Sequence, residues 1–209
     1  MEPTGTEIVI VRHPETTANV GGRFVGRGDS PITEHGREQI SALTTFMEGW
    51  QPDVAFTSPL ARALITARAV VACGTPVRIV ADLREIDFGD AEGLTWDEIT
   101  SRGMGIDYLR NGGALSSDDL GGPGEGPVAP GGETWTAFEA RVRVAALACE
   151  RPGERVAIVT HGGVFRTLVA YWLGLPMESS WRFAIPNATV ATLHVVDGMG
   201  VLKSLQPGR

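Results

Sequence analysis

Histidine and arginine side chains follow several short apolar runs of this sequence, at points where strands would end. Arg12-His13 comes directly after Ile8–Val11, and the motif Thr160–Gly163, which contains a histidine and two glycines, comes directly after Val156–Val159. Arg62 follows a third such run. Parallel strands bring their carboxyl ends together, so these side chains are expected to converge on one crevice. Guanidinium groups and the N–H groups of a glycine-rich helix start are donors for an anion, which predicts an anion-binding site.

The two imidazoles in this arrangement suggest nucleophilic chemistry. Positive charge from Arg12 and Arg62 would disfavour protonation of His13 and His161, so rings with a reference pKa of about 6.5 would stay neutral at physiological pH. A neutral ring nitrogen can attack a bound phosphoryl group, which divides ester hydrolysis into formation and hydrolysis of a phosphohistidine. Glu85 follows another apolar run. Its carboxyl, beside a phosphate dianion, would be held protonated, as the acid that protonates a leaving alkoxide must be.

The elements that must position these residues are strands alternating with helices. Strands are predicted at 7–11, 54–56, 77–80, 155–159 and 189–196. Apolar residues recur at helical spacing after Thr33, after Ser58-Pro59, from Trp135 to Cys149 and from Val164 to Tyr171. This alternation predicts an α/β fold with three layers, α/β/α, around a mostly parallel sheet. The C-terminal pattern, with Asp197-Gly198 between two apolar runs, is typical of a hairpin and predicts one antiparallel edge strand.

One segment, residues 102–132, interrupts the alternation. It contains Asn111-Gly-Gly, Gly121-Gly-Pro-Gly-Glu-Gly-Pro and Pro130-Gly-Gly, with few large apolar residues. Such a segment cannot hold a core, and long loops inside compact domains are usually functional lids or disordered. We expect a single domain over residues 1–209, with a glycine-rich cap loop inserted around 102–132.

Composition excludes several classes of protein. The 209 residues are 43 % hydrophobic and 21 % charged, unlike disordered or fibrous chains. A formal net charge of −7 lacks the basic footprint of a nucleic-acid binder. No apolar run approaches the roughly 20 residues that span a bilayer, and no basic region precedes the first apolar stretch. We therefore expect a soluble, cytoplasmic protein with neither nucleic-acid nor membrane partners.

The motifs also follow one another in a characteristic order. They are Arg12-His13-Pro14-Glu15-Thr16 with Asn19, Arg23 and Asp29-Ser30-Pro31; Ser58-Pro59-Leu60 with Arg62; Glu85 with Phe88-Gly89 and Glu92-Gly93; Pro130-Gly131-Gly132-Glu133; and Thr160-His161-Gly162-Gly163 with Arg166. This series resembles the histidine phosphatase superfamily, also called phosphoglycerate mutase-like or branch 1 histidine acid phosphatases. The resemblance covers nearly the whole chain, and five pieces in this order and spacing are a specific signal.

The resemblance implies a role for each matched residue. It implies that His13 is the phosphorylated nucleophile, that Arg12, Arg62 and His161 bind the phosphate, and that Glu85 donates a proton. Asn19 and Arg23 would line the phosphate or the substrate entrance, and the backbone N–H of Gly162 would bind phosphoryl oxygens. It implies a phosphomonoesterase acting on a small phosphorylated metabolite, for which no cofactor is expected.

Pro14 departs from the family pattern, which usually has glycine after the histidine. Proline removes a backbone N–H and forces His13 away from helical φ/ψ. Extended geometry suits a residue at the end of a strand, and Pro14 could occupy the first position of a short helical turn running to Asn19. We therefore expect the site to tolerate it.

Other functions stay open at this point. His13, His161, Glu85 and Asp87 could ligate zinc, although two arginines in the same site would repel a dication. A cofactor-dependent phosphoglycerate mutase would use the same site, but the glycine-rich segment looks too open to retain the released alcohol. A catalytically weakened binding module for phosphate esters is the alternative from another class. The sequence leaves both the natural substrate and a homodimer open.

Overall fold

The computed structural model describes residues 4–104 and 127–208. Its strands are β1 (Thr6–Arg12), β2 (Val54–Thr57), β3 (Val77–Ile79), β4 (Arg155–Thr160), β5 (Val190–Val196) and β6 (Met199–Gln206). Its α-helices are α1 (Thr17–Val20), α2 (Glu34–Trp50), α3 (Ala61–Val70), α4 (Trp96–Ser101), α6 (Trp135–Cys149) and α7 (Gly162–Trp172). Short 3-10 helices are η1 (Ala81–Leu83), η2 (Gly89–Ala91) and η3 (Met177–Arg182).

The strands form one mixed sheet in the order β3-β2-β4-β1-β5-β6. Strands β3, β2, β4 and β1 pair in parallel. Strand β5 pairs antiparallel with β1 on one side and with β6 on the other, so the C-terminal hairpin supplies the antiparallel edge of the sheet. The predicted α/β fold with a mostly parallel sheet is confirmed.

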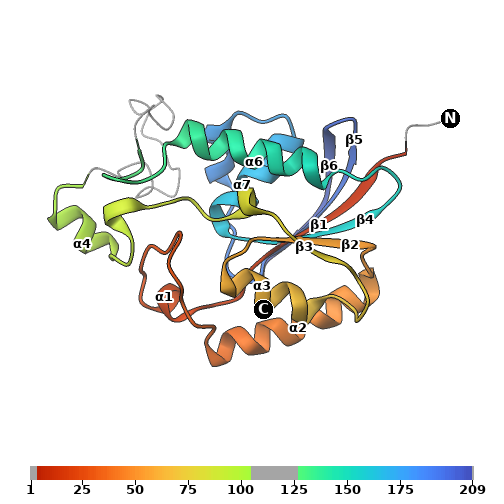
Figure 1. Ribbon diagram of the computed structural model, residues 1–209, viewed down its shortest axis with the longest axis horizontal. Coiled ribbons are helices and arrows are strands. Elements are labelled where there is room, and N and C mark those ends of the chain that lie inside the picture. Colours follow the sequence, from red (N-terminus) through yellow and green to blue (C-terminus); the bar gives the residue numbers. More distant parts are fainter. Residues whose placement is uncertain (1–3, 105–126, 209) are drawn as a thin grey trace.

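Helices cover both faces of this sheet, which gives the three predicted layers (Figure 1). Because side chains alternate along a strand, Val9 and Val11 of β1 face α2 and α3, whereas Ile8 and Ile10 belong to the core beneath α6 and α7. Both sets are fully buried. The central strands β1, β2 and β4 read as nearly continuous apolar runs because both of their faces are covered.

The carboxyl ends of three strands lie side by side. Arg12 at the end of β1 is in register with Thr160 at the end of β4, and Thr57 at the end of β2 pairs with Val159. The N–H of His13 then donates to the carbonyl of Thr160 at 2.9 Å, and the N–H of Ser58 donates to the carbonyl of Val159 at 3.2 Å. The residues that directly follow these three strands therefore lie close together, as the sequence predicted.

The segment predicted as a cap insertion, 102–132, lies for the most part in 105–126, outside the described residues. Its C-terminal portion packs onto the molecule, because Val128 and Ala129 are buried and the N–H of Asp90 donates to the carbonyl of Pro130 at 2.9 Å. Within the described ranges, the helices are each too short or too polar to cross a membrane.

Candidate active site

The two motif histidines meet at the centre of these strand ends. His13 follows β1 directly, and His161 follows β4 as the N-cap of α7. Their ring centroids are 5.2 Å apart in an edge-to-face arrangement. His13 is 4 % exposed and His161 is fully buried. The structure therefore brings together the two imidazoles that the sequence singled out.

The hydrogen bond of His13 defines its proton position. Nδ1 lies 2.8 Å from the carbonyl oxygen of Pro14. A carbonyl oxygen only accepts, so Nδ1 carries the proton and Nε2 keeps a free lone pair. Burial, together with the charges of Arg12 and Arg62, lowers the pKa of His13 well below its ordinary value. The ring is therefore neutral at pH 7, with Nε2 as its nucleophilic atom.

His161 is held by Ser58, which the sequence placed at a strand end but gave no role. The Nε2 atom of His161 lies 2.7 Å from Ser58 Oγ, and the same oxygen accepts the N–H of Leu60 at 3.2 Å. In the described part of the chain, His161 Nδ1 is buried and has no hydrogen-bond partner. Burial and the charge of Arg62 lower the pKa of His161 well below its ordinary value.

Arg12 adds a guanidinium group beside the two histidines, and Arg166 interacts electrostatically with Arg12. Nη1 of Arg12 donates to the carbonyl of Ile185, and Nε of Arg12 is buried without a partner among the described residues. Burial and the charge of Arg166 lower the pKa of Arg12 to about 10. Nε of Arg166 donates to the carbonyl of Phe183 at 3.0 Å, and its Cζ lies 5.1 Å from the centre of the Trp181 ring. An anion would relieve the repulsion between these cations.

Arg62 contributes positive charge to the site and also forms hydrogen bonds with a neighbouring loop. It is 3 % exposed, and its guanidinium donates to the carbonyls of Gly26 and Gly28 at 2.8 Å each. On the other side of that loop, the Glu92 carboxylate accepts the N–H groups of Gly26, Arg27 and Gly28. Arg62 therefore anchors the 26–28 loop beside the site.

Glu85 lies at the start of α7. Its Oε2 accepts the N–H of Gly163 at 3.0 Å, and its Oε1 accepts the N–H of Ile86 at 3.0 Å. The side chain is in the buried set at 8 % exposure. A Cβ at residue 163 would lie 2.5 Å from Glu85 Oε1, so a larger residue than glycine there would displace the Glu85 carboxyl. Glu85 also interacts electrostatically with Arg12, Arg62 and Arg166, which places it in the same cluster as the histidines.

The three residues predicted to contact substrate have different surroundings. Gly162 is the first residue of α7, and a Cβ there would lie 3.3 Å from Arg12 Cζ, so glycine lets the guanidinium lie against the helix start. Asn19 Oδ1 accepts from the N–H and the hydroxyl of Thr16. Arg23 points to the turn before α4, where it donates to the carbonyl of Gly93 at 2.7 Å and to Glu98 at 3.0 Å. The contacts of Arg23 therefore lead away from the histidines.

Asn187 is a site residue that sequence reasoning missed. Its Nδ2 lies 3.2 Å from the carbonyl oxygens of His13 and Pro14, and 3.1 Å from Asn19 Oδ1. The signal in the sequence was the predicted C-terminal hairpin. When its strand β5 pairs antiparallel with β1, β5 starts beside the end of β1. Asn187 precedes β5 and so reaches the backbone of His13.

The expectation for Pro14 was wrong in its detail. The first helix does not begin at Pro14: α1 starts at Thr17, with Thr16 as N-cap in a capping box with Asn19. Pro14 instead continues the extended chain, which leaves its carbonyl oxygen free to accept from both His13 and Asn187. These bonds use the carbonyl of residue 14 and need no N–H there, so proline is accommodated.

The arrangement can bind a tetrahedral oxyanion and attack it. Unpartnered donors converge with guanidinium charge and the start of α7, as anion binding requires. Among the described residues, no group of three or more His, Cys, Asp or Glu side chains is placed to hold a metal ion. A neutral imidazole beside guanidinium groups can attack an anion whose charge those groups offset.

The chain belongs to the histidine phosphatase superfamily (branch 1), whose family model matches residues 8–207. It is 30 % identical over 199 residues to the adenosylcobalamin/alpha-ribazole phosphatase of Escherichia coli K12, covering 94 % of this chain and 93 % of that protein. It is 34 % identical over 209 residues to the metal-independent phosphoserine phosphatase of Arabidopsis thaliana, covering 98 % of this chain and 82 % of the relative.

A solved structure agrees with these sequence relatives. The phosphoserine phosphatase of Entamoeba histolytica, crystallised with 3-phosphoglyceric acid, superposes with a TM-score of 0.78 at 26 % identity, covering 98 % of each chain. The family predicted from the sequence is confirmed, and these relatives are phosphatases, as expected.

Proposed function

We propose that this protein is a metal-independent phosphomonoesterase that hydrolyses a small phosphorylated metabolite through a phosphohistidine on Nε2 of His13. The observation that carries the proposal is the pair of buried imidazoles 5.2 Å apart, both with lowered pKa values, beside the guanidinium groups of Arg12 and Arg62. A neutral nucleophile beside fixed positive charge suits attack on an anionic ester.

In the proposed first step, Nε2 of His13 attacks phosphorus while the ester P–O bond breaks. The electrons of that bond leave on the alcohol oxygen, which takes a proton from Glu85. Nδ1 of His13 keeps its proton and donates it in a hydrogen bond to the carbonyl oxygen of Pro14, so positive charge on the phosphorylated ring is stabilised by that oxygen. Glu85 is left as a carboxylate.

In the proposed second step, water hydrolyses the phosphohistidine. The Glu85 carboxylate takes a proton from water as the water oxygen attacks phosphorus. The N–P bond breaks, its electrons return to Nε2, and inorganic phosphate leaves with Glu85 protonated again. The site is then ready for another ester.

Phosphate binding falls to the donors that lack protein partners. Arg12 Nε and His161 Nδ1 are buried and unpartnered within the described ranges, and the N–H of Gly162 lies at the start of α7. Together with Arg62 they would bind the phosphoryl oxygens. We place Asn19 at the edge of the phosphate site, where it supports His13 through Asn187, and Arg23 at the substrate entrance.

The names of the relatives supply candidate substrates. They point to α-ribazole phosphate and phosphoserine as first compounds to assay. We propose a small phosphorylated substrate, no nucleic-acid or membrane partner, and a cytoplasmic place of action. Monomer and homodimer are distinguished by the mass of the protein in solution.

The test is release of inorganic phosphate from a panel containing these two esters, phosphoglycerates, sugar phosphates and nucleotides. We expect hydrolysis of at least one ester, lost in His13→Ala while the variant stays folded. Undiminished hydrolysis by His13→Ala would contradict the proposal. Interconversion of phosphoglycerates faster than phosphate release would assign the same site to a mutase.

A further inference from the structure

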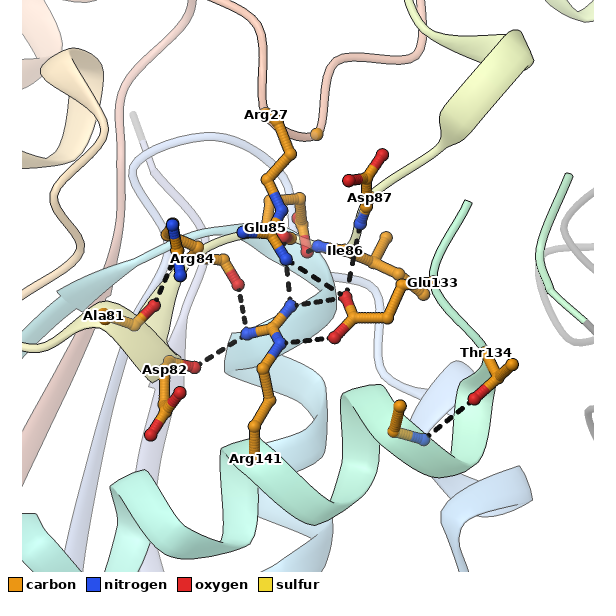
Figure 2. A network of polar contacts seen from close by, with 12 residues as sticks. Arg27, Ala81, Asp82, Arg84, Glu85, Ile86, Asp87, Glu133, Thr134 and Arg141 are labelled. Carbon is orange, nitrogen blue, oxygen red and sulfur yellow. Dashed lines mark hydrogen bonds and ion pairs between the residues drawn. The ribbon is translucent and has the colours of Figure 1, made fainter. Parts of the chain in front are cut away.

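Glu85 lies in a turn whose backbone carbonyls accept hydrogen bonds from Arg141. Figure 2 shows Arg141 reaching from α6 to the chain at 82–85. Its Nη1 donates to the carbonyls of Asp82 at 2.7 Å and Arg84 at 2.6 Å, and its Nη2 donates to the carbonyl of Glu85 at 3.1 Å. These carbonyls lie outside the sheet, so Arg141 satisfies groups that no strand satisfies.

Glu133 fixes Arg141 from the other side. Its carboxylate accepts from Nε of Arg141 at 2.6 Å and from Nη2 at 2.8 Å, a bidentate ion pair. The two side chains are 14 % and 12 % exposed. Burial opposes ionisation of Glu133, but the hydrogen bonds and charge of Arg141 outweigh it and lower the pKa of Glu133.

Glu133 also forms hydrogen bonds with the backbone of Asp87, two residues after Glu85. Its backbone N–H donates to the carbonyl of Asp87 at 2.9 Å, and its Oε2 accepts the N–H of Asp87 at 3.3 Å. Arg141 holds residues 82–85, and Glu133 holds residue 87, so Glu85 lies between two fixed points. Arg27, which comes from the loop anchored by Arg62, is 3.5 Å from Glu133 and joins that loop to the same network (Figure 2).

We infer that Arg141 and Glu133 are positioning residues for the Glu85 carboxyl, and so set the efficiency with which it protonates the leaving group. This inference rests on the proposed function. A lysine at 141 cannot reproduce a planar guanidinium that contacts three carbonyls and one carboxylate. The turn would then shift, and proton transfer depends steeply on the placement of the acid.

The test compares two leaving groups in single-turnover phosphorylation of the enzyme. An alkyl phosphate needs a proton donor, whereas p-nitrophenyl phosphate, whose phenolate leaves readily, needs little protonation. Glu85→Gln is the reference and is expected to slow the alkyl ester by about 10² to 10⁴. Arg141→Lys is expected to slow the alkyl ester by about 10- to 100-fold and the aryl ester by less than about threefold. Glu133→Gln, which keeps the shape of the side chain, is expected to show the same selectivity with a smaller loss.

Two residues on the same helix provide matched controls. Arg143 and Glu139 form an exposed ion pair at 3.8 Å, with side chains 57 % and 34 % exposed. Arg143→Lys and Glu139→Gln are expected to leave both rates unchanged, because exposed pairs contribute little. In the Glu85→Gln background, Arg141→Lys is expected to cost the alkyl ester less than about twofold, since the two residues act on one step.

The outcomes distinguish the positioning role of Arg141 and Glu133 from the proposed phosphatase function. Equal losses on both esters in Arg141→Lys and Glu133→Gln, or full additivity with Glu85→Gln, would overturn the positioning role while the phosphatase stands. Absence of phosphatase activity that depends on His13 in the wild type would overturn the proposed function itself. If Arg141→Lys does not fold, Glu133→Gln decides the question by the same ratio of rates.

Discussion

Ser58 Oγ and His161 Nε2 are 2.7 Å apart, and this contact determines which nitrogen of His161 carries the proton. Ser58 already accepts the N–H of Leu60, so its own hydroxyl proton requires an acceptor. If that acceptor is Nε2, the neutral ring carries its proton on Nδ1, the buried atom with no partner in the described residues. In the opposite tautomer, with the proton on Nε2, the Ser58 hydroxyl proton would lack this acceptor and the Nδ1 lone pair would lack a donor. That lone pair would also repel an anion.

Ser58→Ala is therefore expected to shift His161 toward the tautomer with its proton on Nε2. The ¹⁵N chemical shifts of the ring nitrogens report this directly, and the tautomer of His13 in the same spectrum is the control. Loss of one hydrogen bond of about 1 kcal/mol predicts phosphorylation slowed by about fivefold. An unchanged His161 tautomer in Ser58→Ala would show that another group sets it.

Gly163→Ala should impair catalysis much more than it impairs folding. The added Cβ would lie 2.5 Å from Glu85 Oε1, so the carboxylate must move. We expect hydrolysis of an alkyl phosphate to fall by about 10²-fold, the cost of misplacing a reacting group by about 1 Å.

The matched control for that variant is Gly49→Ala in α2, where a Cβ would meet nothing within 4 Å. It should leave activity unchanged and stabilise the protein by up to about 1 kcal/mol, from helix propensity alone. Equal activity of Gly163→Ala and the wild type would show that the Glu85 carboxyl can move without consequence. Thermal unfolding of both variants checks the stability terms.

The stability of the free protein should fall as the pH drops below the ordinary histidine pKa. Burial lowers the folded-state pKa of His13 and His161, so below about pH 6.5 the unfolded chain binds protons that the folded protein does not. Stability therefore rises with pH through this window and levels off above it, with a slope approaching about 1.4 kcal/mol per pH unit for each ring.

Urea unfolding between pH 5 and pH 7.5, in buffers without phosphate, measures this slope. His13→Gln should reduce the slope, and the difference from the wild type isolates the contribution of His13 from those of the carboxylates. A variant with the wild-type slope would mean that His13 is protonated in the folded protein.

Removal of metal ions should leave activity intact. The negative charge of a bound phosphate ester is offset by Arg12, Arg62 and Arg166. A metal cation in the same site would be repelled by these guanidinium groups. We expect full turnover after prolonged treatment with EDTA, and competitive inhibition by vanadate. Activity that disappears on chelation and returns with zinc or magnesium would instead point to metal-assisted hydrolysis.

Much of the fold and the centre of the site could be predicted because each depends on local pattern. Buried strands require apolar runs and parallel strands align their ends, so the motifs after β1 and β4 indicated that His13 and His161 would meet. The position of Asn187 depends instead on where distant elements pack. Asn187 reaches His13 only through the pairing of β5 with β1.

Arg141 and Arg143 illustrate the limit more sharply. They are two residues apart on α6, yet Arg141 is 14 % exposed and Arg143 is 57 % exposed. Arg141 lies three residues after Phe138 and four before Ala145, at the margin of the buried stripe. That spacing is a signal for an inward-facing side chain, but the three carbonyls it binds come from a turn that the helix pattern does not specify.

The most direct measurement is the identification of the phosphorylated atom. The wild type is mixed briefly with a hydrolysed ester, quenched in base, and examined by ³¹P NMR and peptide mass spectrometry. We predict a phosphoramidate on Nε2 of His13 that is labile in acid and stable in base, absent from His13→Ala and accumulating in Glu85→Gln with an aryl ester, because hydrolysis of the intermediate then lacks its base. Turnover without any phosphorylated histidine, or label retained by His13→Ala, would contradict this account.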